Sequence, residues 1–125
     1  MRRQPAFTEQ SLLAELVGRE LSSIEFVRDY LQFRFDGPTL TVYTSPVVFS
    51  GGRSHAVTDA GYRDQLVSLI GKEVSDSRFK PDQEFVLGFT TGEILRVPLD
   101  ATSRPVPGEA MVFNFNDDAR RTVVV

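Results

Sequence analysis

The chain has 125 residues, a length typical of one compact domain. It contains no cysteine, which excludes disulfides, thiolate metal sites, iron–sulfur clusters and cysteine nucleophiles. Fourteen basic and 17 acidic residues give a formal net charge of −3, which argues against a nucleic-acid-binding surface. These values indicate a single globular domain over residues 1–125 that has no nucleic-acid partner.

The N-terminal residues carry Arg2 and Arg3 but no apolar stretch behind them. A secretory signal needs an apolar core of ~7–15 residues, and a membrane span needs ~20. We therefore expect a cytoplasmic protein that makes no membrane contact.

Two short helices are predicted, each ended by a glycine. The first runs from Thr8, an N-cap candidate, to Val17 and stops at Gly18; the second follows Asp59, a second cap candidate, and stops at Gly71. The apolar stripes expected to face the core are Leu12, Leu13, Leu16 and Val17 in the first helix and Tyr62, Leu66, Leu69 and Ile70 in the second.

Strand-like segments follow each helix. Residues 20–27 and 73–79 are the least regular, and the spacing from Leu21 to Ile24 predicts a bulge. Residues 30–35 and 85–89 alternate cleanly, after turns at 28–29 and 81–82. The inward side chains are predicted to be Leu31, Phe33 and Phe35 in the first of these strands and Phe85, Leu87 and Phe89 in the second. Further strands are predicted at 40–44, 47–50, 94–97 and 110–115.

An internal repeat relates these elements. Shifting the chain by 53 positions aligns residues 12–29 with 65–82, and seven of the 18 pairs are identical. The identical pairs include Leu13/Leu66, Gly18/Gly71 and Glu20/Glu73. Two copies are too few for a solenoid, so the pattern favours a duplicated unit packed as a pseudo-dimer.

The predicted fold class is therefore α+β. We expect an α-β-β-β(-β) unit that occurs twice, over about residues 8–50 and 59–115, with an inter-repeat loop at 50–58. The strands would form antiparallel meanders covered by the two helices and related by a pseudo-two-fold axis.

Catalytic patterns are sparse. His55 is the single histidine, which leaves no two-histidine metal site, and no Gly-x-Ser-x-Gly motif is present. Glu20/Glu73 and Asp29/Asp82 recur at matched positions and would suit acid–base chemistry if the halves faced each other, but turn and surface roles are the stronger interpretation. We expect no enzyme activity, no cofactor and no metal.

The segment from Ser50 to His55 is glycine-rich. Gly51 and Gly52 could present backbone N–H groups to an anion that Arg53 would clamp. A flexible linker between the repeats explains the segment without a ligand, and we favour that interpretation over a binding loop.

Residues that differ between the repeats are the better candidates for specificity, because identical residues serve the shared packing. This criterion selects Tyr30, Arg34 and Tyr43 of the first repeat, to which we add Arg53 and His55. Tyrosine and arginine are enriched in interface hot spots, whereas outward aromatics can also simply favour strands. These five residues are the candidate ligand- or partner-binding residues.

Three phrases in the chain resemble a family of small uncharacterised bacterial proteins: Val17 to Leu21, Phe26 to Phe35, and Ile70 to Val74. The likeness spans most of residues 12–100 and includes both Val/Ile-Gly-Arg/Lys-Glu segments. It implies a shared fold and a bacterial source, and it implies no activity. In size and charge the chain is also similar to immunity proteins of bacterial toxin systems.

The leading hypothesis is a non-enzymatic protein–protein interaction module in a bacterial cytoplasm, self-associating as a homodimer, with an immunity-type inhibitor as its narrower form. The alternative is a small-ligand or anion-binding protein that uses the inter-repeat loop, and a carboxylate-dependent enzyme ranks third. The C-terminal segment ending in Val123, Val124 and Val125 would add an edge strand within the chain or pair with a second subunit.

Overall fold

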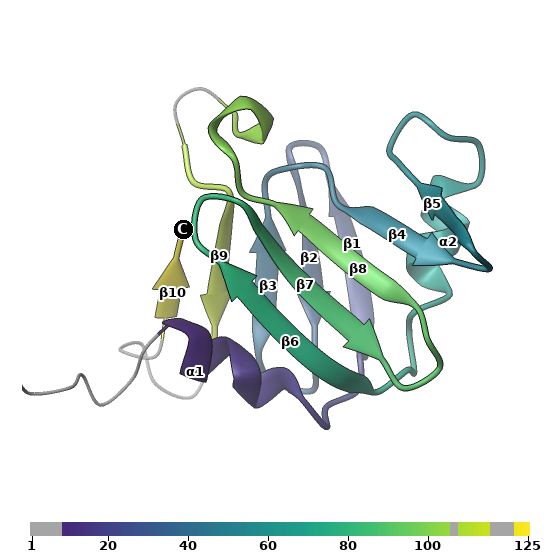
Figure 1. The fold of residues 1–125 in the computed structure, drawn as a ribbon, viewed down its shortest axis with the longest axis horizontal. Coiled ribbons are helices and arrows are strands. Elements are labelled where there is room, and N and C mark those ends of the chain that lie inside the picture. The colour runs from purple at the N-terminus through teal and green to yellow at the C-terminus, as the bar shows by residue number, and fades with distance from the viewer. Residues whose placement is uncertain (1–8, 106–107, 116–121) are drawn as a thin grey trace, which may run out of the picture.

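The computed structural model describes residues 9–105, 108–115 and 122–125. They form two five-stranded antiparallel sheets with a few short helices, which agrees with the predicted α+β class (Figure 1). No helix in these ranges is long and apolar enough to cross a membrane.

The first sheet has the strand order β1-β2-β3-β9-β10. Its strands are β1 (Ser23–Val27), β2 (Tyr30–Arg34), β3 (Thr39–Val42), β9 (Met111–Asn114) and β10 (Thr122–Val124). The C-terminal strand β10 pairs with β9, so the predicted edge strand within the chain is confirmed.

The second sheet has the strand order β5-β4-β8-β7-β6. Its strands are β4 (Val47–Ser50), β5 (Arg53–His55), β6 (Val74–Lys80), β7 (Glu84–Phe89) and β8 (Ile94–Pro98). The register of β6 on β7 shifts between Val74 and Asp76, a bulge at the position that matches the irregularity predicted near Leu21.

The two predicted meanders, β1-β2-β3 and β6-β7-β8, are present, but the fourth strand of each does not stay with its own meander. β4 leaves the first meander and pairs with β8, whereas β9 follows the second meander and pairs with β3. Each sheet therefore contains a strand from the other part of the chain, which ties the two sheets together.

The two sheets lie one in front of the other in Figure 1, and their inward side chains form one hydrophobic cluster. The predicted alternation of the inner strands is confirmed. The fully or almost fully buried residues include Phe33, Phe35, Phe85, Leu87 and Phe89. Leu31 is partly buried and packs against the same cluster.

The helices are shorter than predicted. α1 covers Glu9–Leu13 and continues as the 3-10 turn η1 (Ala14–Leu16), and α2 covers Tyr62–Val67. Because both α-helices end early, Val17 and Ile70 rotate off the apolar stripes and are exposed, so their predicted burial was wrong. The predicted cap Thr8 lies outside the described residues.

Asp59 does not cap α2, which corrects the second cap prediction. Gly61, in a left-handed conformation with φ 80°, precedes the helix. The Oδ2 of Asp59 instead accepts a hydrogen bond from the backbone N–H of Ala56, at 2.7 Å, and so stabilises the turn before the helix.

The helices do not cover the sheet faces as predicted, because the sheets cover each other. α1 lies along β6, where the Ser77 hydroxyl donates to the Leu13 carbonyl at 3.1 Å, and α2 lies near β4 and β5 (Figure 1). A further 3-10 turn, η2 (Ala101–Ser103), follows β8.

The segment 50–58 is not simply a flexible linker. Gly51 and Gly52, with φ values of 61° and 76°, form the two-residue turn of the β4–β5 hairpin. Two consecutive residues with positive φ are typical of a tight hairpin turn, and this need accounts for both glycines.

The segments after the two helices pair with each other at an isolated bridge between Glu20 and Glu73. The backbone N–H of Gly18 donates to Val74 at 2.8 Å, and that of Gly71 donates to Leu21 at 2.7 Å. Gly18 and Gly71 share a φ of 89°, as expected for glycines that end helices.

Candidate functional site

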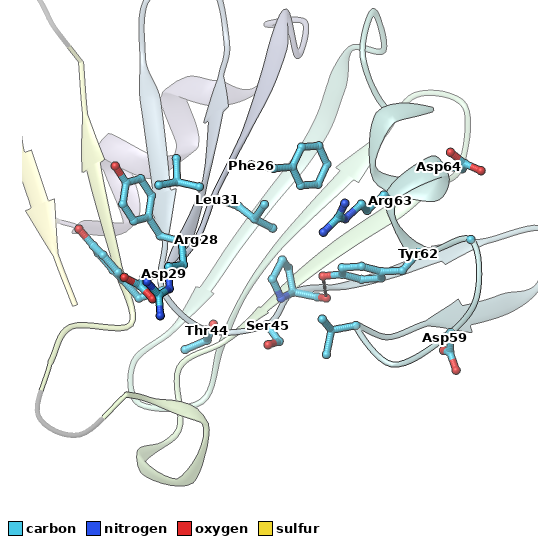
Figure 2. Close-up of a pocket in the computed structure, with 16 residues that line it drawn as sticks. Phe26, Arg28, Asp29, Leu31, Thr44, Ser45, Asp59, Tyr62, Arg63 and Asp64 are labelled. Carbon is cyan, nitrogen blue, oxygen red and sulfur yellow. Dashed lines mark hydrogen bonds between the residues drawn. The ribbon is translucent and has the colours of Figure 1, made fainter.

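A cleft of about 780 Å³ opens between α2, the β1–β2 turn and the segment from Tyr43 to Pro46 that leads into β4. In Figure 2 the labelled side chains of Phe26, Tyr62 and Arg63 lie at one end of the cleft, and those of Arg28 and Asp29 lie at the other. Thr44 and Ser45 lie between the two ends. This volume is in the range of about 300–1,000 Å³ that is typical of ligand sites.

Tyr62 fixes the α2 end of the cleft. Its hydroxyl donates a hydrogen bond of 2.5 Å to the Pro46 carbonyl, which holds α2 against the segment before β4. Burial disfavours the charged phenolate and raises the pKa of Tyr62 to about 12. Tyr62 is therefore a structural wall of the cleft and a neutral group near pH 7.

Arg63 faces the cleft from the same helix. Its guanidinium carbon lies 5.8 Å from the centroid of the Phe26 ring, a cation–π distance. Phe26 is 39% exposed although it lies on the inward-pointing side of β1. Arg63 and Phe26 together form a cationic and aromatic surface at this end.

The other end carries Tyr30 and Tyr43, whose ring centroids lie 5.6 Å apart at an interplanar angle of 54°. Tyr30 begins β2 and Tyr43 follows β3, and both side chains are half-buried. Arg28 and Asp29 form the two-residue turn between β1 and β2 beside them. Each of these residues is positioned by a strand end or a tight turn, so this end of the cleft is well supported.

Thr44 lies between the two ends and is 7% exposed. Its Oγ1 is buried and has no hydrogen-bond partner among the described residues. A buried hydroxyl without a partner costs about 1–3 kcal/mol. Thr44 therefore carries a polar group that the folded chain itself does not use.

Five charged residues line the cleft: Arg28, Asp29, Asp59, Arg63 and Asp64. In Figure 2 the carboxylates of Asp59 and Asp64 point away from the cleft, whereas the Arg63 guanidinium points towards it. Arg28 and Arg63 make no ion pair with any residue that the structure describes. Asp29 lies beside Arg28 at one end of the cleft, whereas Arg63 at the other end has no ion-pair partner among the described residues and favours an anionic group there.

The corresponding place in the second meander is closed by the chain itself. Arg104 donates from Nε to the Leu99 carbonyl at 2.9 Å and reaches Asp82, in the β6–β7 turn, at 3.6 Å. The backbone N–H of Leu99 also donates to the Gln83 carbonyl at 2.9 Å. The two meanders therefore differ at the place where the first one forms the cleft.

Of the five candidate residues, the structure brings Tyr30 and Tyr43 together in the cleft. Arg34 lies elsewhere, because its Nη2 is bound to Glu25 Oε1 at 2.9 Å and to Gln32 Oε1 at 2.9 Å. Arg53 and His55 lie in β5, outside the cleft lining.

Arg28, Thr44, Tyr62 and Arg63 line the cleft but were not among the predicted site residues. The internal repeat could have identified two of them, Arg28 and Arg63. With the same shift of 53 positions, Arg28 corresponds to Pro81 and Arg63 corresponds to Gln10. Applying the criterion of differing residues to every pair would have selected both arginines.

A smaller hollow of about 220 Å³ lies on the second sheet. It is lined by Phe49, Arg78, Lys80, Glu84, Val86, Ile94 and Arg96. Arg96 and Glu84 form an ion pair of 2.5 Å there, so part of its charge is already neutralised. In the described ranges no three His, Cys, Asp or Glu side chains gather in a way that could hold a metal ion.

No family model, no curated protein and no solved structure matches this chain.

Proposed function

We propose that the protein is a non-enzymatic protein–protein interaction module of a bacterial cytoplasm, and that it binds its partner in the cleft between α2 and the β1–β2 turn. The observation that carries this proposal is the difference between the meanders. The cleft is open in the first meander, whereas Arg104 and Leu99 close the corresponding place in the second.

The side chains of the cleft suit this role. Tyr30, Tyr43, Arg28 and Arg63 belong to the residue types that are enriched in interface hot spots. Aromatic side chains supply contact area at a low entropic cost, and an unpaired arginine gains a charge-assisted hydrogen bond when a partner arrives.

Site-specific photo-crosslinking in the cells that produce the protein tests the proposal. The photoreactive amino acid p-benzoylphenylalanine would replace Tyr43 in the cleft and, in a separate variant, Phe49. Phe49 is a matched control because it is also an aromatic residue at the surface, 39% exposed, but lies on the second sheet. We expect a discrete cross-linked protein from position 43 and none from position 49.

Cross-linking from neither position, or equally from both, would contradict the proposal. The mass of the product also identifies the kind of partner. A product of twice the chain mass means that a second copy occupies the cleft, which is the expected homodimer. A cross-linked partner that is a different protein, encoded by a gene next to the gene of this chain, would support the narrower form, an immunity-type inhibitor.

A small ligand is the second candidate, and the cleft volume of about 780 Å³ favours it. The guanidinium of Arg63 would recognise a small anionic molecule with hydrogen-bond acceptors. Native mass spectrometry of the protein purified from its own cells would detect a retained small molecule, and a homogeneous extra mass would favour this candidate.

We also infer that the chain is a duplication of one α-β-β-β-β unit. Four backbone bonds at the junction of the two parts support this inference, because they form two pairs that are related by a shift of 53 positions. Gly18 N–H to Val74 corresponds to Gly71 N–H to Leu21, and Leu21 N–H to Lys72 corresponds to Val74 N–H to Arg19. The mutual exchange of β4 and β9 between the sheets has the same symmetry.

A further inference from the structure

β1 is an edge strand of the first sheet, and its free edge lies at the cleft. The two-residue turn makes Val27 and Tyr30 a pair that exchange both backbone hydrogen bonds. In an antiparallel ladder the next pair, Phe26 and Leu31, is not hydrogen-bonded. The N–H and C=O groups of Phe26 and of Ile24 therefore point away from β2, toward the free edge.

The same edge of the second sheet is closed by one side chain. The carboxamide of Gln10 in α1 accepts a hydrogen bond from the Phe79 N–H at 3.0 Å and donates to the Ser77 carbonyl at 3.4 Å. These are the two groups that an added strand would bond on β6. The Gln10 side chain thus takes the place of one peptide unit of a neighbouring strand.

No described residue covers the edge of the first meander in this way. The residue that corresponds to Gln10 is Arg63, and a guanidinium donates hydrogen bonds but cannot accept one. No described residue accepts a hydrogen bond from the Phe26 N–H outside the β1–β2 ladder. The Phe26 N–H and the Arg63 guanidinium are therefore two donors on this side for which an incoming oxygen atom would be an acceptor.

The charged residues near this edge indicate whether the incoming oxygen is neutral or belongs to a carboxylate. Arg63 makes no ion pair with a described residue, Asp59 is bonded to the Ala56 N–H, and Asp64 points away from the cleft (Figure 2). Asp29 lies at the opposite end of the cleft, beside Arg28. Glu25 of β1 is bound to Arg34. A partner segment with acidic side chains is therefore complementary to this edge.

We propose that the partner binds through an extended acidic segment that adds as a strand beside β1, with a carboxylate held by Arg63. The segment would lie about 4.8 Å from β1, and its backbone would bond the outward groups of Ile24 and Phe26. This inference rests on the proposed function, since it names the class of partner for the same cleft.

The experiment begins with selection of binders from a random dodecapeptide library displayed on phage, with the full-length protein as bait. We expect enriched peptides that carry Asp or Glu among apolar residues. No enrichment over the starting library would contradict the proposal. The tightest peptide is then synthesised with a fluorescent label and titrated by fluorescence anisotropy.

Arg63→Gln should weaken binding of this peptide by roughly tenfold or more, because it removes a charge-assisted hydrogen bond. The matched control is Arg78→Gln, which removes an exposed arginine of β6 that pairs with Asp76. Thermal unfolding of both variants checks that each is folded. Equal affinities for the wild-type protein and Arg63→Gln would overturn the acidic part of the proposal.

The strand-addition part has its own readout. Bound peptide should slow amide hydrogen exchange at Phe26 by at least about tenfold and leave Phe79 unchanged, since a new acceptor covers only Phe26. Two N-methylated peptides would be compared, one methylated at every odd-numbered nitrogen and one at every even-numbered nitrogen. Only the set that faces β1 should abolish binding, because alternate N–H groups of a strand point to the same side. A peptide that binds without protecting Phe26 would contradict strand addition but leave the proposed function standing, whereas absent photo-crosslinking from position 43 would contradict the function itself.

Discussion

Tyr62 joins α2 to the segment before β4 through one buried hydrogen bond to the Pro46 carbonyl. A net contribution of about 1 kcal/mol is expected for such a bond, and more when its loss leaves a buried carbonyl without a partner. The position of α2, and with it the width of the cleft, depends on this contact.

Tyr62→Phe should lower the free energy of unfolding by about 1–2 kcal/mol at pH 7. The difference from wild type should shrink as the pH rises above 10. The unfolded chain ionises this tyrosine near pH 10, whereas the folded protein keeps its proton up to about pH 12. The stabilisation by Tyr62 is thus complete below pH 10 and lost between pH 10 and 12. Urea unfolding of both proteins at pH 7, 10 and 11 measures this, and a difference that grows with pH would contradict the account.

Thr44, in contrast, has a buried hydroxyl to which no described residue is hydrogen-bonded. Thr44→Val keeps the shape and removes the buried unpaired hydroxyl, so it should raise the free energy of unfolding by up to about 1 kcal/mol. The same variant should bind the selected peptide or a retained ligand no better than wild type. A loss of stability in thermal unfolding would mean that Oγ1 has a partner in the folded protein.

At the scale of elements, α1 and α2 contact the edge strands β6 and β1 differently. Gln10 of α1 bonds two backbone groups of β6, whereas Arg63 of α2 lies over the Phe26 ring of β1. One helix therefore closes a sheet edge and the other leaves it available.

Gln10→Ala should cost about 1–2 kcal/mol of unfolding free energy, because it removes two hydrogen bonds and uncovers the β6 edge. The matched substitution Arg63→Ala should cost less than about 0.5 kcal/mol, since it removes only an exposed side chain. Urea unfolding of the two variants side by side gives the comparison. Equal costs would argue that α1 and α2 hold their strands in the same way.

The elements also show which features a sequence can predict. The inward faces of β2 and β7 follow from alternation, which is local, and Phe33 and Leu87 are buried as expected. The exchange of β4 and β9 depends on which strands meet in space, and no local pattern carries that information. The helix ends were missed because η1 has three residues per turn and moves Val17 off the stripe.

The same distinction applies to the candidate site. Tyr30 and Tyr43 could be selected from the differences between the repeats, and they lie together in the cleft. Arg34 satisfied the same criterion but is bound to Glu25 within its own sheet. The sequence could not show this, because cross-strand partners cannot be identified before the register is known. Thr44 offered no sequence signal, because its burial without a partner arises only from the packing.

At the scale of the whole molecule, two meanders exchange a strand and join at the bridge between Glu20 and Glu73. Gly18 and Gly71 flank this junction with the same φ of 89°. A methyl group at either glycine would meet no atom within 4 Å, so the cost of adding one comes from the backbone alone.

Gly18→Ala and Gly71→Ala should therefore each cost about 1–2 kcal/mol, and the two values should agree within about 0.5 kcal/mol if the parts are duplicates. Gly108→Ala is the control, because its β-carbon would make ordinary contact with Pro105 at 3.6 Å and no left-handed φ is involved. Thermal or urea unfolding gives all three values. Costs that differ by more than about 1 kcal/mol between Gly18→Ala and Gly71→Ala would count against duplication.

The edges of β1 and β6 correspond to each other, and the proposed binding role of β1 requires that its edge be open while that of β6 is covered. Amide hydrogen exchange in the free, full-length protein measures this difference directly by NMR at Phe26 and Phe79. The Phe79 amide is bonded to Gln10, whereas no described group accepts from the Phe26 amide at the edge. We predict that Phe26 exchanges at least about 100-fold faster than Phe79. Equal rates, or slower exchange at Phe26, would mean that the first edge is already closed and would contradict its role as a binding site.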